Sequence, residues 1–170
     1  RRSERAHDIS GLTGGNSTLG FGMPVLLAKD DEFGHRAGEI FVSIFDDAYC
    51  TYGKWGDRFP HIGGPVILCF LSPWVVPEAL LNGAELAINF HSGTHDYPGT
   101  TPYNFALYEG AETYGCVCHH MAEKADTGPI IEERTFRVSP RETVQSLRVR
   151  TATVMLGMFS DICDKIVSSG

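Results

Sequence analysis

Two polar side chains, Asn89 and His91, end the otherwise apolar stretch "LAINFH" at residues 86–91. Side chains alternate between the two faces of a strand, so both would lie on one face and converge on the same small group. Asp126 follows in "EKADTGPII", in a turn between two further apolar segments. A carboxamide, an imidazole and a carboxylate together can stabilise an oxyanion and move a proton. These three residues are therefore the candidate catalytic set.

No strong nucleophile accompanies this set, because neither Ser nor Cys occurs in an elbow pattern such as G-x-S-x-G. The set suits direct attack of a substrate amine on a carbonyl, without a covalent enzyme intermediate. The spacing alone leaves a second interpretation open. Asn89 and His91 would then make turn hydrogen bonds at a strand end, and Asp126 would cap a turn.

The spacing of apolar residues predicts the elements that position these side chains. Strands are predicted at residues 24–29, 48–53, 65–71, 86–91, 114–121 and 129–138, the last as one or two strands. Helices are predicted at 30–45, 77–83, 101–110 and from 139 to the C-terminus, where "SPRE" has the form of a capping box. This alternation predicts an α/β fold, an open, mostly parallel Rossmann-like sheet with helices on both faces. Ligands bind beyond the carboxyl ends of such strands, where His91 is placed.

Composition limits the class of protein. The chain has 170 residues, 42% hydrophobic and 21% charged, which is typical of one soluble domain. Residues 1–22 are polar and rich in Gly and Ser, so we expect a leader or flexible extension before a catalytic domain at 23–170. The net charge of −7 disfavours nucleic acid as a partner. No segment approaches the roughly 20 apolar residues that span a membrane.

The five cysteines are an odd number, and three of them lie in apolar runs. They indicate reduced thiols in a cytoplasmic protein rather than a disulfide framework. The sequence "CVCHH" raises the alternative of a zinc site, because Cys116, Cys118 and His120 would share a strand face. A structural zinc site generally has four ligands in paired short spacings, and no second pair is present. We therefore predict no metal and a buried core strand.

The Asn-x-His pair followed by Asp in "DTGPI" resembles the active-site signature of the folate-dependent formyltransferases. That family includes glycinamide ribonucleotide formyltransferase, the catalytic domain of methionyl-tRNA formyltransferase and the sugar N-formyltransferases. The resemblance covers residues 71–81, 87–131 and, loosely, the closing helix. It implies an enzyme of one-carbon metabolism that uses 10-formyltetrahydrofolate as formyl donor. Asn89 and His91 would hydrogen-bond the formyl oxygen as it becomes an alkoxide, while Asp126 would orient His91 or a water and help to move the proton.

The same resemblance implies which residues bind the folate. One segment would wall the pterin pocket and one loop would meet the pterin through backbone groups; together they comprise Leu71, Ser72, Pro73, Trp74, Val75, Val76, Met121, Ala122, Glu123, Lys124 and Ala125. His95 and Asp96, just beyond His91, are expected either to contact the acceptor or to be solvated turn residues. His119 or His120 could also touch the substrate.

Departures from the family narrow the acceptor. Glycinamide ribonucleotide enzymes carry a Gly-rich phosphate loop where this chain has three acids, in "LLAKDDEFGHR". Methionyl-tRNA formyltransferase has "SLLP" after the His, where this chain has "SGTHDYPG". What remains is a small primary amine, and the resemblance to the sugar N-formyltransferases implies a nucleotide-linked amino sugar as acceptor. The alternatives are formyltetrahydrofolate hydrolysis, activity of the glycinamide ribonucleotide or methionyl-tRNA type, and a non-catalytic folate-binding module. The apolar face of the last helix raises the further expectation of a homodimer.

Overall fold

The structure is a computed structural model that describes residues 23–99 and 102–169. The expectation for residues 1–22 lies outside the described residues. The elements, in chain order, are β1 Val25–Lys29, α1 Glu32–Ile44, β2 Tyr49–Gly53, β3 Val66–Phe70, α2 Glu78–Gly83, β4 Leu86–His91, α3 Pro102–Tyr108, β5 Thr113–His120, β6 Ile130–Arg137 and α4 Val144–Ser169. Within the described ranges, none of the helices combines the length and the apolar character needed to cross a membrane.

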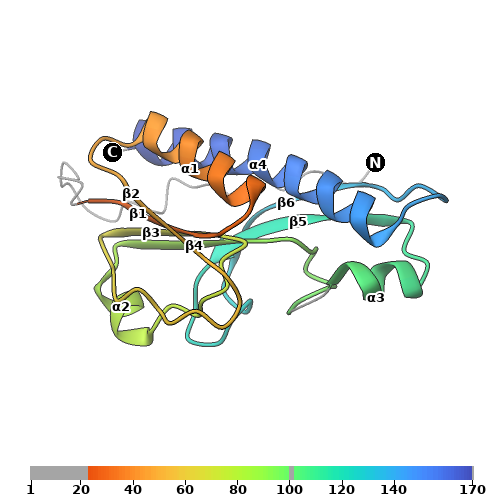
Figure 1. Cartoon of the computed structure of the whole chain (residues 1–170), viewed down its shortest axis with the longest axis horizontal. Helices are drawn as coiled ribbons and strands as arrows, with labels where there is room; N and C mark the ends of the chain where they lie inside the picture. The colour runs from red at the N-terminus through yellow and green to blue at the C-terminus, as the bar shows by residue number, and fades with distance from the viewer. Residues whose placement is uncertain (1–22, 100–101, 170) are drawn as a thin grey trace.

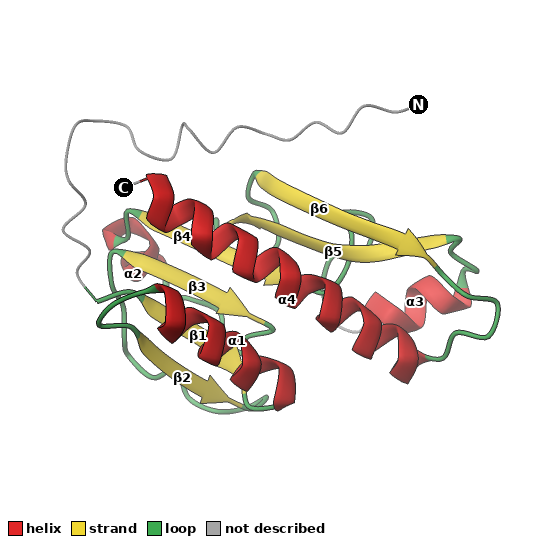
Figure 2. Ribbon diagram, turned by 90° about the horizontal axis from the view of Figure 1, so that it is seen from above, coloured by secondary structure: helices red, strands yellow, loops and turns green. Residues whose placement is uncertain are grey.

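The strands form one sheet in the order β2-β1-β3-β4-β5-β6 (Figure 1). β1 to β4 are parallel to one another, whereas β5 is antiparallel to both of its neighbours. Helices α1 and α4 lie side by side along one face of the sheet, and α2 lies on the other (Figures 1 and 2). The predicted open, mostly parallel α/β fold is confirmed. The carboxyl ends of β1, β3 and β4 therefore share one edge.

The central strand β3 is buried along its whole length, between β1 and β4. A parallel strand covered on both faces needs apolar side chains on both, which explains the unbroken run "VILCF". On the α4 side, the ring of Phe159 lies 5.4 Å from that of Phe70 and 4.9 Å from that of Phe90. This cluster joins α4 to β3 and β4, so it holds the strand that carries Asn89 and His91.

Helix α1 begins where its sequence supplies a cap. The Oδ1 atom of Asp31 accepts a hydrogen bond from the Gly34 N–H at 3.0 Å, so Asp31 is the N-cap of the helix. On the inner face of α1, Phe33, Ala37 and Phe41 are buried. A backbone N–H group in the first turn of α1 is thus hydrogen-bonded to a carboxylate of the protein itself.

The prediction for the start of the last helix is wrong by several residues, because α4 begins at Val144 and not next to Ser139. Ser139 and Glu142 close a separate turn, in which the Glu142 N–H donates to the Ser139 carbonyl at 2.9 Å. The actual cap is Thr143, whose Oγ1 accepts from the Ser146 N–H at 3.1 Å. Ser146 Oγ in return accepts from the Thr143 N–H at 2.9 Å.

The predicted Ser139–Glu142 pattern does form reciprocal bonds, because Glu142 Oε2 accepts from the Ser139 N–H at 3.3 Å and Ser139 Oγ accepts from the Arg141 N–H at 3.3 Å. It closes the turn before α4, whereas the helix itself is capped by Thr143.

Candidate active site

The candidate site lies at the carboxyl end of β4, where Asn89 and His91 are partly buried on the same face of the strand. β5 runs antiparallel beside β4, in a register that places His119 directly opposite Asn89. Asp126 belongs to the loop between β5 and β6. The structure brings the three predicted residues together and adds His119 to them.

The two oxygens of Asp126 face different partners. Oδ1 accepts a hydrogen bond from Asn89 Nδ2 at 3.1 Å and lies 3.4 Å from His119 Nε2. Oδ2 accepts from the Gly99 N–H at 3.3 Å and lies 3.8 Å from His91 Nδ1. The distance to His91 exceeds a hydrogen bond, so Asp126 does not orient that ring by direct contact in this structure. A single carboxylate nevertheless faces the carboxamide and both imidazoles.

The electrostatics of this cluster favour charge on Asp126 and on His119. Burial, at 4% side-chain exposure, opposes protonation of His119. The hydrogen bonds of that ring to Asp126 and to the His120 carbonyl, 2.8 Å from Nδ1, outweigh burial and raise the pKa of His119. The hydrogen bond with His119 in turn lowers the pKa of Asp126 against the effect of burial, and His91 lowers it further. Asp126 is therefore an ionised carboxylate at neutral pH.

Local backbone geometry turns Asp126 toward β4. Its φ of +57° lies in the left-handed region, which costs a residue with a side chain about 1 kcal/mol or more. Gly128 packs so tightly that a Cβ atom there would lie 1.8 Å from the His120 carbonyl oxygen. The ladder between β5 and β6 also shifts register between Cys118 and His119, and such bulges re-aim side chains. The close contact at Gly128 explains why glycine is required two residues after Asp126.

His119 was predicted only as a possible substrate contact and not as a member of the catalytic set. The alternation along β5 does place it on the face opposite Cys116 and Cys118. Which residue of β4 it would meet depends on strand register, which the alternation does not reveal. His120 points to the other face, and burial lowers its pKa.

The predicted core strand around Cys116 and Cys118 is confirmed. Both thiols lie in the apolar core, and burial raises the pKa of each to about 12. Across residues 23–99 and 102–169, no three side chains of His, Cys, Asp or Glu are grouped as metal ligands.

Comparison with known proteins identifies the family. Residues 66–161 match the family described as "Formyl transferase", and these residues make up more than half of the chain. The chain belongs to the formyl transferase family. The likeness in Asn89, His91 and Asp126 is thus part of a match that extends from β3 into α4.

Individual relatives of this formyl transferase chain carry several names. It is 28% identical over 96 residues to the bifunctional polymyxin resistance protein ArnA of Wigglesworthia glossinidia brevipalpis. That alignment covers 55% of this chain and 15% of ArnA. It is 39% identical over 57 residues to a formyltetrahydrofolate deformylase of Synechocystis sp.. That alignment covers 34% of this chain and 20% of the deformylase. The chain spans a fifth or less of these two curated relatives.

A solved structure extends the likeness to the fold. The formyl transferase chain superposes on a sugar N-formyltransferase from Shewanella sp FDAARGOS_354 with a TM-score of 0.70 at 18% identity. The superposition covers 86% of this chain and 70% of the other. At that level of identity the likeness is one of fold.

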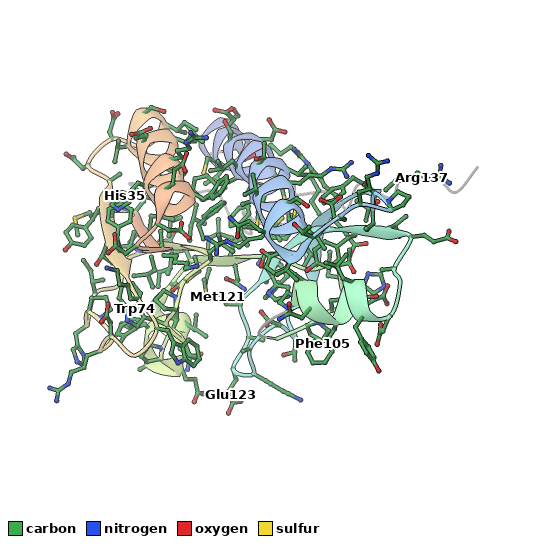
Figure 3. The ribbon with its side chains drawn as sticks, turned by 45° about the vertical axis from the view of Figure 1, so that its right-hand side comes forward. His35, Trp74, Phe105, Met121, Glu123 and Arg137 are labelled. Atoms are coloured by element: carbon green, nitrogen blue, oxygen red, sulfur yellow. The ribbon has the colours of Figure 1, made fainter. Side chains whose placement is uncertain are left out.

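The two segments predicted to bind the folate meet on the face of the sheet that carries α2, except for Leu71. Trp74, Val76 and Met121 share one apolar cluster, whereas Leu71 packs against the core on the opposite side. Figure 3 shows the loop carrying Met121 and Glu123 on the same side of the sheet as Trp74. An open hollow of about 390 Å³ is lined by Trp55, Gly56, Asp57, Phe59, Pro73, Trp74 and Val75. It includes three of the predicted folate residues and none of the three catalytic candidates.

His95 and Asp96 are exposed and lie outside the Asp126 cluster. Glu133 of β6 accepts from the His95 N–H at 2.9 Å and lies 2.8 Å from its Nδ1. The hydrogen bond and the charge of Glu133 raise the pKa of His95. These contacts join the loop after His91 to β6, and a role with the acceptor stays a prediction.

Proposed function

We propose that this chain transfers a formyl group from 10-formyltetrahydrofolate to the primary amine of a small substrate, a nucleotide-linked amino sugar. The observation that carries the proposal is the cluster at the end of β4. There Asp126 Oδ1 lies 3.1 Å from Asn89 Nδ2 and Asp126 Oδ2 lies 3.8 Å from His91 Nδ1. Family membership supports the formyl chemistry, and the carboxylate at the start of α1 supports an acceptor other than glycinamide ribonucleotide.

In this proposal Asn89 donates to the formyl oxygen as negative charge develops on it. Its Nδ2 already contacts Asp126 Oδ1 and lies 3.2 Å from His119 Nε2. The His120 carbonyl accepts from His119 Nδ1–H, so Nε2 accepts from Asn89 only while the ring is neutral. In the charged ring, which Asp126 favours, the Nε2–H faces Asp126 Oδ1 instead. The formyl oxygen would replace the weaker contact of Asn89 with His119, because the ionised Asp126 is the stronger acceptor. One such preorganised donor is worth about 3 kcal/mol in the transition state.

His91 and Asp126 handle the proton. The nitrogen of the acceptor forms a bond to the formyl carbon and loses a proton, which His91 Nδ1 or the Asp126 carboxylate accepts. The same proton is then returned to the folate nitrogen as its bond to the formyl carbon breaks. The products are a formamide and tetrahydrofolate, and no redox partner is needed.

The cysteines of β3 and β5 support direct transfer over a covalent route through them. Cys69, Cys116 and Cys118 are buried, and burial raises the pKa of each to about 12. Only the thiolate is a strong nucleophile, so these thiols are inert at neutral pH. The amine itself is then the attacking group.

The start of α1 argues against glycinamide ribonucleotide as acceptor. Asp31 accepts from the Gly34 N–H and lies 3.2 Å from Lys29 Nζ, so a carboxylate occupies the helix N-terminus. A Cβ at Gly34 would lie 1.8 Å from the Lys29 carbonyl oxygen, so the turn is closed on itself. A phosphate would meet negative charge where related enzymes provide free N–H groups. An acceptor without a phosphate at this point fits better.

Hydrolysis is the second candidate, because one relative is named formyltetrahydrofolate deformylase. Water would then attack in place of the amine, with the same three residues in the same roles. The geometry of Asn89, His91 and Asp126 serves both nucleophiles. The presence of an acceptor-dependent rate distinguishes them.

The test is an incubation with 10-formyltetrahydrofolate and a panel of nucleotide-linked amino sugars, amino acids and amino nucleotides. Tetrahydrofolate release is followed with each amine and with buffer alone, and Asp126→Asn serves as the inactive control. We expect release that depends on an amino sugar and is lost in the variant. Equal release in buffer, with formate as product, would establish hydrolysis. Folate binding without any release would establish a binding module and refute the proposal.

A further inference from the structure

The ring of His91 makes a backbone contact that decides where its hydrogen lies. Nε2 lies 2.9 Å from the carbonyl oxygen of Tyr97. A carbonyl oxygen only accepts hydrogen bonds, so Nε2 carries the hydrogen. In the neutral ring the lone pair is therefore on Nδ1, the atom that faces Asp126.

Nδ1 of His91 and Oδ2 of Asp126 then form a pair of acceptors. They lie 3.8 Å apart, too far for a direct hydrogen bond. Two facing acceptors without a shared proton are complementary to a donor from outside, such as the N–H groups of an attacking amine. In the opposite tautomer Nδ1 would already carry a hydrogen and could not take the proton of the acceptor.

The Tyr97 carbonyl reaches His91 across Gly93. A Cβ atom at residue 93 would lie 2.5 Å from the Tyr97 oxygen and 3.0 Å from His91 Nε2. Both of these atoms belong to the hydrogen bond itself. A methyl group at this position would therefore force them apart. The φ angle of Gly93 is not in the left-handed region, so its requirement for glycine is one of space.

The segment that presents the carbonyl is anchored on both sides. The Ser92 carbonyl accepts from the buried Tyr114 hydroxyl at 2.7 Å. The Tyr97 N–H donates to the Thr94 carbonyl at 2.9 Å, and the rings of Tyr97 and Tyr114 lie 5.6 Å apart. Ser92 and Thr94 are themselves buried. The loop cannot easily move the carbonyl away to relieve a clash at Gly93.

We propose that Gly93 is a positioning residue for formyl transfer. Its lack of a side chain lets the Tyr97 carbonyl hold His91 as the Nε2–H tautomer, which keeps Nδ1 free to accept the proton of the attacking amine. The catalytic meaning of this rests on the proposed function. The tautomer itself is a property of the free protein and can be measured without any substrate.

The first experiment reads the tautomer directly. Long-range proton–nitrogen NMR correlations are recorded on the full chain at a pH where the His91 ring is neutral, and the His91 signals are assigned by comparison with His91→Gln. We expect the pattern of a ring protonated at Nε2. A ring protonated at Nδ1 would overturn the inference, whatever the activity of the enzyme.

The second experiment compares Gly93→Ala with Gly83→Ala, because a Cβ added at Gly83 meets nothing within 4 Å. For Gly93→Ala we expect a mixture of His91 tautomers and a fall in kcat on the order of 100-fold, with the KM for the folate little changed. Gly83→Ala should match the wild type in each respect. A Gly93→Ala enzyme with full kcat and a single Nε2–H tautomer would contradict the proposal.

Two further outcomes separate this inference from the proposed function. If Gly93→Ala does not fold, as judged by circular dichroism, the wild-type tautomer decides the question. If the wild type transfers no formyl group yet Gly93→Ala alters the tautomer, the positioning of His91 stands and the proposed reaction fails.

Discussion

Asp126 connects every polar group of the site, and its two oxygens have separate tasks. One oxygen contacts Asn89 and His119, which sit opposite each other on neighbouring strands. The other faces His91 and the Gly99 N–H. Because the carboxylate is ionised, it fixes the amide of Asn89 before any substrate arrives. Preorganisation of this kind supplies much of the rate enhancement in reactions that develop an oxyanion.

Removal of the Asn89 amide should therefore affect the reaction more than binding. For Asn89→Ala we expect kcat to fall on the order of 100- to 1,000-fold, because the proposed donor to the oxyanion is lost. The affinity for the folate should stay within about twofold. Steady-state tetrahydrofolate release and folate titration measure the two effects. Asn82→Ala, an exposed amide on α2, is the control. Unchanged kcat in Asn89→Ala would place the oxyanion elsewhere.

The pair of Asp126 and His119 predicts a pH-dependent stability. The lowered pKa of Asp126 contributes stability above pH about 4, which is lost as the pH falls through that pKa. The raised pKa of His119 contributes stability below pH about 6.5, which is lost as the pH rises through that pKa. The pair should therefore stabilise the fold most between about pH 4 and 6.5.

Urea unfolding of the wild type and of Asp126→Asn across this pH range tests the pair. We expect the variant to be less stable by about 1–3 kcal/mol between pH about 4 and 6.5. The difference should shrink at alkaline pH, where His119 is neutral. Asp164→Asn, an exposed carboxylate on α4, should show no such profile. A difference that grows with pH would refute the assignment.

For helix α4, the sequence correctly predicts a capped helix but places its first residue too early. Two consecutive capping patterns, one starting at Ser139 and one at Thr143, stand at the start of its apolar face. The N–H groups near Ser139 are satisfied inside a turn, so the helix starts at the second pattern. Burial of residues such as Leu147 and Ile162 against the sheet selects the helical segment.

The position of the cap yields a paired prediction. Thr143→Ala should lower the free energy of unfolding by about 1 kcal/mol, because the first turn of α4 loses its acceptor. Ser139→Ala should have a smaller effect, since Ser139 lies in the preceding turn. Urea denaturation of both variants side by side provides the measurement. A larger loss in Ser139→Ala would mean that the helix starts earlier than observed here.

The aromatic cluster under α4 links the stability of the fold to the geometry of the site. Phe159 is fully buried, and its ring lies within 6.4 Å of the Phe41, Phe70 and Phe90 rings. For Phe159→Ala we expect a loss of about 3–5 kcal/mol in the free energy of unfolding. Phe105→Ala, on the exposed side of α3 (Figure 3), should change it by less than about 0.5 kcal/mol. Equal losses in thermal or urea unfolding would contradict this view of the core.

The expectation of a homodimer through α4 has lost its original basis. The apolar face of α4 that suggested a second copy is buried against the chain's own sheet. A homodimer stays a prediction, and it would have to use another surface. Size-exclusion chromatography with light scattering measures the state directly.

Much of the fold follows from local chemistry that is readable in the sequence. The apolar run of β3, the spacing of apolar residues in α1 and the alternation of β4 each predict an element that the structure contains, because burial acts over a few residues. The family signature in turn identified Asn89, His91 and Asp126 as a set. The placement of α4 failed, since two caps of similar strength compete and only tertiary packing chooses between them.

Residue types and their periods determined the α/β class, the buried strands and the polar end of β4. They did so because side-chain alternation and burial are properties of short segments. Strand register and loop return are instead properties of the folded chain. Register placed His119 opposite Asn89, and the left-handed turn at Asp126 brought its carboxylate to both. The steric requirement for glycine at residue 93 arises only in the folded chain, where the Tyr97 carbonyl lies beside His91. A steric contact exists only between atoms that folding brings together.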